Sequence, residues 1–309
     1  MKITLKQLQV FVAVARYENL SKASEALFMT KGAVSQALAE LERKLGVLLF
    51  DRPHPKLLLN HEGMRLLPMA DELVHRAGDI ERTFMDSASE GREGEFLRIG
   101  CTKTIGNYVL PELLAGFSAR TGWLPEVEIA NTGEILRMLA GFTLDVALLE
   151  GEERLPEIVF EPWLEDEMVV IAPPWHPLAD GRNLEAGDLR NEKWIVRELD
   201  SGSREFFNHT LAPMVAPFSI ALTLGSPSAI VRSVSQGLGV AFTSRLSATA
   251  ALSAGRIAVI DLRERFPRTF SLCCHSRKYH ASAMRQFLRF CREMSGRGLP
   301  DASGATAAP

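Results

Sequence analysis

The chain has 309 residues, a length typical of about two domains. Hydrophobic residues make up 46% of it and charged residues 24%, a composition that excludes an intrinsically disordered protein. No apolar run approaches the roughly 20 residues that span a bilayer, and residues 1–16 lack the apolar core and cleavage site of a signal peptide. We therefore expect a cytoplasmic protein without membrane contact.

Charge is distributed unevenly along the chain. The first 60 residues carry nine Lys or Arg against five Asp or Glu, a formal charge of +4. Because the whole chain carries −3, the remainder carries −7. A basic N-terminal segment on an acidic body indicates a polyanionic partner for that segment, although a charge of +4 is also common on a solvated surface.

The spacing of apolar residues predicts three short helices in the basic segment. The first covers residues 5–15, and the second covers about residues 22–28 after a break at Asn19. Thr30 is suited to cap a third helix, which ends at Gly46 and whose buried stripe is expected to include Leu45. Two short helices joined by a three-residue turn are the helix-turn-helix unit.

The third helix is polarised along its length. Its N-terminal half exposes Lys31, Ser35 and Gln36, which can hydrogen-bond to base edges or phosphates, whereas its C-terminal half exposes Glu40, Glu42 and Arg43. This polarity is typical of a recognition helix that enters the major groove with its N-terminal residues. A plain three-helix packing module is the alternative. We assign DNA contacts to Thr30, Lys31, Val34, Ser35 and Gln36.

Residues 46–60 predict a hairpin or wing, because two apolar stretches flank a proline-rich tip. Arg52, His54 and Lys56 lie at this tip, where they can reach phosphates or the minor groove. Pairing of Arg52 with Asp51 at the surface explains that arginine equally well.

Specific motifs in this segment resemble the LysR-type transcriptional regulators. They are residues 21–27 (SKASEAL), 33–36 (AVSQ), 41–42 (LE), 45–52 (LGVLLFDR) and 60–63 (NHEG). The resemblance covers nearly the whole chain. It implies a winged helix-turn-helix, a dimerising helix and a two-lobed effector-binding domain, with double-stranded operator DNA as a partner. Where the family usually has Ser-Gln-Pro or Ser-Gln-Ser, this chain has Thr30-Lys31-Gly32, so the operator preference is not carried over.

The sequence after the wing predicts a dimer seam, that is, a helix face through which two chains pair. Apolar residues recur at heptad spacing, and such a stripe needs a partner to bury it; they are Leu66, Ala70, Leu73, Ala77, Ile80 and Phe84. Packing on the chain's own body is the alternative. Pro68 predicts a kink or a later helix start. The resemblance likewise implies a linker-helix dimer, and residues 87–94 are expected to form a flexible hinge.

The rest of the chain predicts two α/β lobes. Strands expected at residues 96–101, 126–130 and 145–149 alternate with helices, which indicates a parallel sheet. Further strands are expected in the second lobe, among them 168–172 and 219–224. We divide the chain into a winged helix-turn-helix (1–60), a linker helix (61–88), an effector-binding domain (94–295) and a disordered tail (296–309). Lobe I takes about residues 94–163 and 267–295, and lobe II about 164–266. The resemblance implies a fold like that of periplasmic binding proteins.

Polar residues follow the predicted strands at their carboxyl ends, where ligands of open α/β sheets bind. These candidates for effector binding are Thr102, Thr104, Asn131 and Thr132. Ser201, Gly202, Ser203 and Arg204 lead into a helix predicted at 205–211. Backbone N–H groups, hydroxyls and a cation at a helix start suit a small anion, although an ordinary serine cap with a surface arginine is equally compatible. Ser226 is a further candidate before another helix.

Several body motifs look like the CysL/YeiE-type branch of the family, which is tied to sulfite and cysteine metabolism. They are residues 104–111 (TIGNYVLP), 161–167 (EPWLEDE), 201–205 (SGSRE) and 237–240 (GLGV). Sulfite or a related sulfur compound is therefore a candidate effector. The first motif also occurs in regulators of carbon fixation, and residues 225–228 (GSPS) stand where relatives often carry GNSE. Activation, with autorepression of a divergent gene, is what the family resemblance implies.

No catalytic, metal or cofactor motif is present. The sequence lacks G-x-S-x-G, H-E-x-x-H and P-loop patterns, and its seven histidines show no metal-ligand spacing. The four cysteines form no C-x-x-C pair and are expected to be buried apolar residues. We predict a non-enzymatic regulator that forms a homodimer or homotetramer, with RNA polymerase as a candidate partner. A helix-turn-helix fused to a small-molecule-processing α/β enzyme is the alternative.

Overall fold

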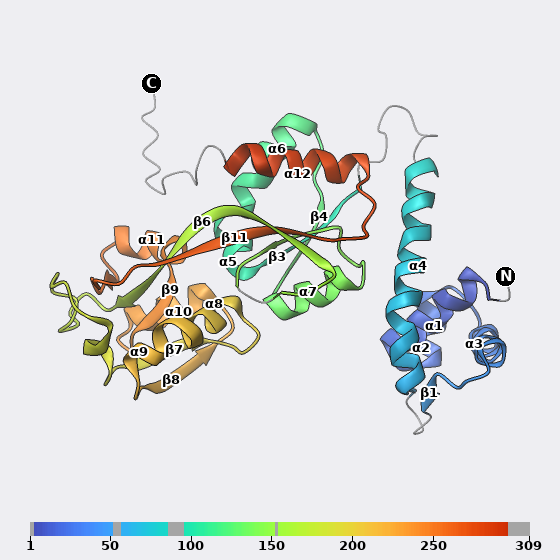
Figure 1. Ribbon diagram of the computed structural model, residues 1–309, viewed down its shortest axis with the longest axis horizontal. Helices are drawn as coiled ribbons and strands as arrows, with labels where there is room; N and C mark the ends of the chain where they lie inside the picture. Colours follow the sequence, from blue (N-terminus) through green and yellow to red (C-terminus); the bar gives the residue numbers. More distant parts are fainter. Residues whose placement is uncertain (1–2, 52–56, 86–95, 152–153, 296–309) are drawn as a thin grey trace. The chain divides into compact units, whose positions relative to one another are not determined.

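The computed structural model describes residues 3–51, 57–85, 96–151 and 154–295 (Figure 1). The chain divides into two compact units. The first contains Met1–Gly94 with Ala140–Thr143, and the second contains Glu95–Leu139 with Leu144–Pro309. The predicted hinge and tail lie outside the described residues. In the described part, no helix combines the length and apolarity that a membrane crossing requires.

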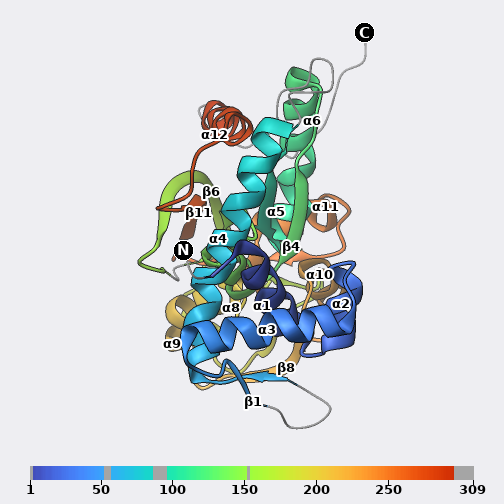
Figure 2. The same ribbon diagram turned by 90° about the vertical axis from the view of Figure 1, so that its right-hand side faces the viewer.

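The first unit is a helical head with a small wing. Its elements are α1 (Leu5–Tyr17), α2 (Leu20–Ala26), α3 (Lys31–Leu45), the antiparallel strands β1 (Phe50–Asp51) and β2 (Leu58–Leu59), and the long helix α4 (His61–Met85). Figure 2 shows α3 along its length, with β1 after it in the chain. The predicted helix-turn-helix and hairpin are confirmed.

Local hydrogen bonds explain where the helices of the head begin and end. Asn19 Oδ1 accepts the backbone N–H of Ser21 at 2.8 Å, and Thr30 Oγ1 accepts that of Ala33 at 3.2 Å. Gly46 ends α3 with φ of +75°, a left-handed conformation that costs glycine little. The predicted caps are therefore confirmed. Helix α2 lies about two residues earlier than predicted, because Phe28 adopts φ of +52° and turns the chain.

Two predictions about α3 are wrong. Glu42 is not on the exposed face but buried, and its carboxylate accepts the backbone N–H of Leu49 at 2.9 Å. This bond joins the recognition helix to the start of the wing. Leu45, predicted in the buried stripe, is 38% exposed because the helix ends there.

Helix α4 starts at His61 and continues through Pro68, so neither a later start nor a break occurs. Asn60 Oδ1 accepts the backbone N–H of Gly63 at 2.9 Å, which satisfies a donor in the first turn. Ala70 is fully buried in the core of the head, and Leu66 packs against that core. Ala70 therefore cannot belong to a seam with another chain, which corrects that prediction. Leu73 and Ile80 remain 50% and 63% exposed.

The second unit contains two lobes. Lobe I holds β3 (Arg98–Thr102), α5 (Lys103–Tyr108), α6 (Leu110–Thr121), β4 (Glu126–Ala130), α7 (Thr132–Ala140), β5 (Val146–Leu149) and α12 (Ser282–Ser295). Lobe II holds the 3-10 helix η2 (Ala186–Leu189), β7 (Lys193–Arg197), α8 (Gly202–Phe206), the π-helical turn η3 (Phe207–Leu211), α9 (Ala212–Val215), β8 (Ser219–Leu224), α10 (Pro227–Ser235), β9 (Ala241–Ser244), α11 (Arg245–Ser253) and β10 (Ala258–Val259). The predicted two-lobed α/β domain is confirmed.

Two long antiparallel strands, β6 (Ile158–Ala172) and β11 (Phe266–His275), connect the lobes (Figure 1). The main sheet has the order β10-β6-β11-β5-β3-β4, with β9 also paired to β6. Strands β4, β3 and β5 are parallel, as predicted, whereas β11 and β6 pair antiparallel with their neighbours in the same sheet. The reason is that the chain leaves lobe I through β6 and returns through β11.

Each lobe has its own apolar core. The core of lobe I contains buried residues up to Leu164 and again from Phe270 onward. The core around β7 and α9 in lobe II contains buried residues between Met168 and Phe266. The lobes therefore meet where β6 and β11 cross between these cores. All four cysteines are unpaired; three are buried as predicted, and Cys274 is half-buried.

Candidate functional site

The start of α3 presents a polar surface. Lys31, Ser35 and Gln36 are exposed, and Gln36 Nε2 contacts Glu40 Oε1 at 3.5 Å on the same face. Thr30 is also exposed, although its hydroxyl caps the helix. Val34 is fully buried in the head core, so its predicted contact with DNA is wrong.

The predicted wing tip cannot be placed. Arg52, His54 and Lys56 lie outside the described residues. The strands that lead to and from the tip, β1 and β2, are described and paired.

Predicted effector residues of both lobes meet around the carboxylate of Glu150, which was not itself among the predicted effector residues. Thr104 Oγ1 donates to Glu150 Oε1 at 3.0 Å, and Ser203 Oγ donates to the same oxygen at 3.2 Å. The backbone N–H of Gly202 donates to Thr132 Oγ1 at 3.0 Å, which in turn donates to the carbonyl oxygen of Glu150 at 3.3 Å. Thr104 and Thr132 belong to lobe I, and Gly202 and Ser203 to lobe II.

Glu150 is part of a buried ionic network on the connecting strands. Arg268 Nη2 lies 3.1 Å from Glu150 Oε2, and Arg268 Nε donates to Asp166 Oδ2 at 2.7 Å. Arg268 Nη1 also donates to Ser203 Oγ at 3.0 Å, and Ser244 Oγ donates to Asp166 Oδ1 at 2.8 Å. Burial raises the pKa of Asp166, although the bonds from Arg268 and Ser244 oppose this shift.

Part of the predicted anion position at the start of α8 is therefore used by the protein itself, because the Ser203 hydroxyl donates to Glu150. Glu150 directly follows β5, at a strand end like that of Thr102, but it was not among the predicted effector residues. Asp166 and Arg268 lie inside long strands, where no local pattern distinguishes them.

A second ionic contact joins the lobes at Lys103. Its Nζ donates to Glu198 Oε1 at 2.9 Å and to the carbonyl oxygen of Gly225 at 2.8 Å. Burial raises the pKa of Glu198, but hydrogen bonds from Arg197 and Lys103 outweigh it and lower the value to about 2. Glu198 is therefore ionised at neutral pH and holds Lys103 across the cleft.

Two predicted effector residues carry buried hydroxyls without a hydrogen-bond partner among the described residues. They are Thr102 Oγ1, at the end of β3 in lobe I, and Ser201 Oγ, before α8 in lobe II. Both residues are at most 3% exposed. Buried hydroxyls normally find partners, and leaving one unsatisfied costs about 1–3 kcal/mol. Each of these two hydroxyls therefore carries an uncompensated desolvation cost.

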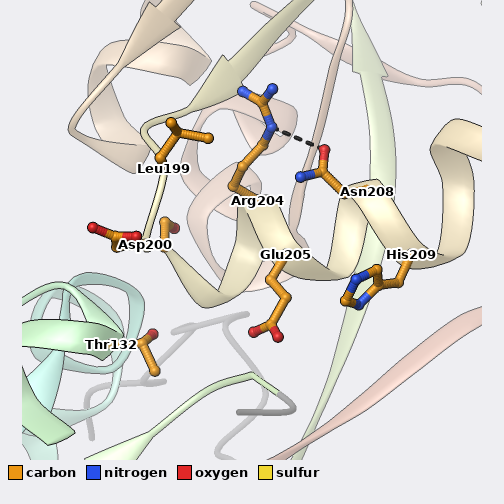
Figure 3. A pocket seen from close by; sticks show the side chains of 8 residues that line it. Thr132, Leu199, Asp200, Arg204, Glu205, Asn208 and His209 are labelled. Atoms are coloured by element: carbon orange, nitrogen blue, oxygen red, sulfur yellow. Dashed lines mark hydrogen bonds between the residues drawn. The ribbon is translucent and has the colours of Figure 1, made fainter.

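A pocket of about 290 Å³ opens beside Ser201 (Figure 3). We call it the α8 pocket; it is lined by Thr132, Leu199, Asp200, Ser201, Arg204, Glu205, Asn208 and His209. Arg204 is not the free cation that we predicted, because its Nε donates to Asn208 Oδ1 at 3.0 Å and its Nη1 donates to the carbonyl oxygen of Arg197 at 3.1 Å. Burial lowers the pKa of Arg204.

The other two predicted effector residues have local roles. Asn131 Oδ1 accepts the backbone N–H of Glu134 at 2.8 Å at the start of α7. Ser226 Oγ lies 2.8 Å from Ser228 Oγ. Over the described ranges, no group of three or more His, Cys, Asp or Glu side chains could hold a metal ion.

Comparison with known protein families identifies both units. Residues 5–64 match the bacterial regulatory helix-turn-helix protein, lysR family, and residues 90–296 match the LysR substrate binding domain. The chain belongs to the LysR family of transcriptional regulators. It is therefore a ligand-responsive DNA-binding regulator, and the alternative of a fused enzyme is dropped.

Curated relatives have the same organisation. The chain is 36% identical over 293 residues to the transcriptional regulator YeiE of Escherichia coli K12, covering 94% of this chain and 98% of that protein. It is 32% identical over 245 residues to CysL of Bacillus subtilis, covering 77% and 79% respectively.

Solved structures share the fold. OxyR of Pseudomonas aeruginosa superposes with a TM-score of 0.72 at 19% identity, covering 96% of this chain and 95% of that one. The regulatory domain of CcmR from Synechocystis PCC6803, in complex with 2-PG, gives 0.61 at 23% identity, covering 65% and 97%.

Gly202→Ala should force the lobes apart. The added Cβ would lie 2.4 Å from the carbonyl oxygen of Glu150 and 3.0 Å from Thr132 Oγ1, so one side of the contact must move. Overpacking of this kind costs about 1–3 kcal/mol. Urea denaturation should show this loss. Gly187→Ala is the control, since its Cβ would meet nothing closer than 3.9 Å. Equal stability of the two variants would contradict a tight contact at Gly202.

Proposed function

We propose that this regulator couples operator binding to a small anionic effector held between the two lobes. The observation that carries the proposal is the pair of unsatisfied buried hydroxyls, Thr102 Oγ1 in lobe I and Ser201 Oγ in lobe II. A ligand that accepts hydrogen bonds from both would remove two desolvation costs at once.

The class of effector is supported by likeness to other regulators. The motifs shared with the CysL/YeiE-type branch support sulfite or a related sulfur compound. The CcmR domain bound to 2-PG supports a small ligand in a domain of this fold. We propose that the ligand shifts the closure of the lobes and thereby changes the spacing or bend of the operator DNA, in the cytoplasm and with RNA polymerase as a further partner. Such a shift requires different affinities for the two lobe arrangements.

A thermal-shift panel tests the effector. We expect at least one of sulfite, sulfate, thiosulfate, O-acetylserine and small carboxylates to raise the melting temperature, because binding to the folded state stabilises it. Thr102→Val and Ser201→Ala should each remove most of that shift, whereas Thr223→Val, on the exposed side of β8, should keep it. A shift that survives both cleft variants would place the ligand elsewhere, and no shift from any anion would refute an anionic effector.

We propose that Lys31, Ser35 and Gln36 read the operator, supported by their exposure at the first turns of α3. Lys31→Ala and Gln36→Ala should each weaken specific operator binding by about 1–3 kcal/mol, because each removes a hydrogen bond to a base. Binding curves on operator and scrambled DNA measure this loss. Arg43→Ala, near the other end of the same helix, is the matched control. Unchanged affinity in both test variants would reject the assignment.

We propose that α4 pairs two chains through Leu73 and Ile80, with Leu66, Ala77 and Phe84 along the same heptad stripe, to give a homodimer or homotetramer. The exposure of Leu73 and Ile80 supports this seam. Leu73→Glu should yield monomers by light scattering, because it places a charge in an apolar contact. Met64→Glu, on an exposed position of α4 outside the stripe, should leave the oligomer intact. Oligomers that persist in Leu73→Glu would exclude the seam.

A further inference from the structure

The α8 pocket carries negative charge that the rest of the molecule leaves uncompensated. Asp200 and Glu205 both line it, and neither carboxylate has an ion pair or hydrogen bond among the described residues. This is unusual here, because the other carboxylates of the cleft, Glu150, Asp166 and Glu198, are each paired with a cation. The pocket therefore offers two carboxylates that can accept hydrogen bonds from a positively charged group.

The pocket's own arginine is turned away from these carboxylates. Arg204 extends to one side of the helix and Glu205 to the other, toward Thr132 (Figure 3). The Arg204 guanidinium is engaged by Asn208 and by the carbonyl oxygen of Arg197. The wall between Asp200, Glu205 and Thr132 is consequently acidic.

An independent observation places a ligand group at this wall. Ser201 is 3% exposed, lines the same pocket, and its Oγ has no hydrogen-bond partner in the described part of the chain. The neighbouring Thr132 hydroxyl is already used, since it accepts from Gly202 and donates to the carbonyl oxygen of Glu150. Ser201 Oγ is thus free either to accept an N–H from a cationic group or to donate to an anionic one.

We propose that the effector is a zwitterion, with an ammonium group bound by Asp200 and Glu205 and an anionic group bound by the hydroxyl of Ser201, which lines the same pocket. This inference rests on the proposed anionic effector and narrows its class. An organic ammonium fits better than a metal ion, because no metal-ligating cluster exists among the described residues. A volume of about 290 Å³ lies at the small end of ligand pockets, roughly 300–1,000 Å³, which suits a molecule of amino-acid size.

Matched pairs of small molecules test the ammonium group. Taurine and isethionate share a sulfonate and differ in an ammonium or a hydroxyl, and L-alanine and L-lactate differ in the same way. Calorimetric titration of the full-length protein should show that each ammonium compound binds about tenfold more tightly than its hydroxyl counterpart, the factor expected for a charged hydrogen bond. Asp200→Asn and Glu205→Gln should each reduce that preference severalfold. Glu126→Gln, an exposed acid on β4, should keep it.

The outcomes separate this inference from the proposed function. If both members of a pair bind equally, and Ser201→Ala weakens both, the anionic effector stands and the ammonium site is refuted. If only ammonium compounds bind, and binding is insensitive to Ser201→Ala, the site recognises the ammonium group alone and the zwitterion is refuted. If none of the four compounds binds, the zwitterionic class is rejected, and the separate anion panel decides whether the proposed function survives. Binding only in the presence of a divalent metal would also overturn the inference.

Discussion

The arrangement of the two lobes depends on one buried guanidinium. Arg268 lies on a strand that passes from one lobe to the other, and it holds Glu150 of lobe I and Asp166 on the opposite connecting strand. Taking these charges out of water is expensive, and removal of one member of such a network leaves an uncompensated charge that costs several kcal/mol. Hydroxyl groups support the network: those of Thr104 and Ser203 donate to Glu150 Oε1, and that of Ser244 donates to Asp166 Oδ1. Polar groups from both lobes therefore converge there.

This network also limits where a ligand can bind. The start of α8 looks like an anion site in the sequence, but the Glu150 carboxylate already receives the donors there. The hydroxyls of Thr102 and Ser201 are among the buried groups that lack a hydrogen-bond partner in the described part of the chain. The α8 pocket, with its two free carboxylates, lies next to one of them. Because Glu150 already supplies a carboxylate to the donors between the lobes, the charged residues of the neighbouring α8 pocket can discriminate among ligands.

Elements whose boundaries depend on neighbouring residues were predictable from the sequence. Asn19, Thr30 and Gly46 mark helix ends because their bonds and dihedral angles are local, and β4 and β8 begin and end at the predicted residues. The first half of β6 was missed because acidic residues and a proline interrupt its apolar pattern, and its stability comes from pairing with β11 more than 100 residues away. Glu42 was misplaced for the same reason, since its partner Leu49 lies beyond the helix. The effector residues around Glu150 could be predicted one by one from the sequence. The hydrogen bonds among them could not, because they form only when distant parts of the chain come together.

The way α4 is anchored has a mechanical consequence for a homo-oligomeric regulator. One flank of this helix, through Leu66 and Ala70, is continuous with the core of the DNA-binding head, while Leu73 and Ile80 face outward further along. Pro68 lies between Leu66 and Ala70 without ending the helix, so no break separates the DNA-binding head from Leu73 and Ile80. The helix is therefore a stiff lever fixed to the head, and any change in the angle at which two such levers cross would be transmitted directly to the distance between the two recognition helices.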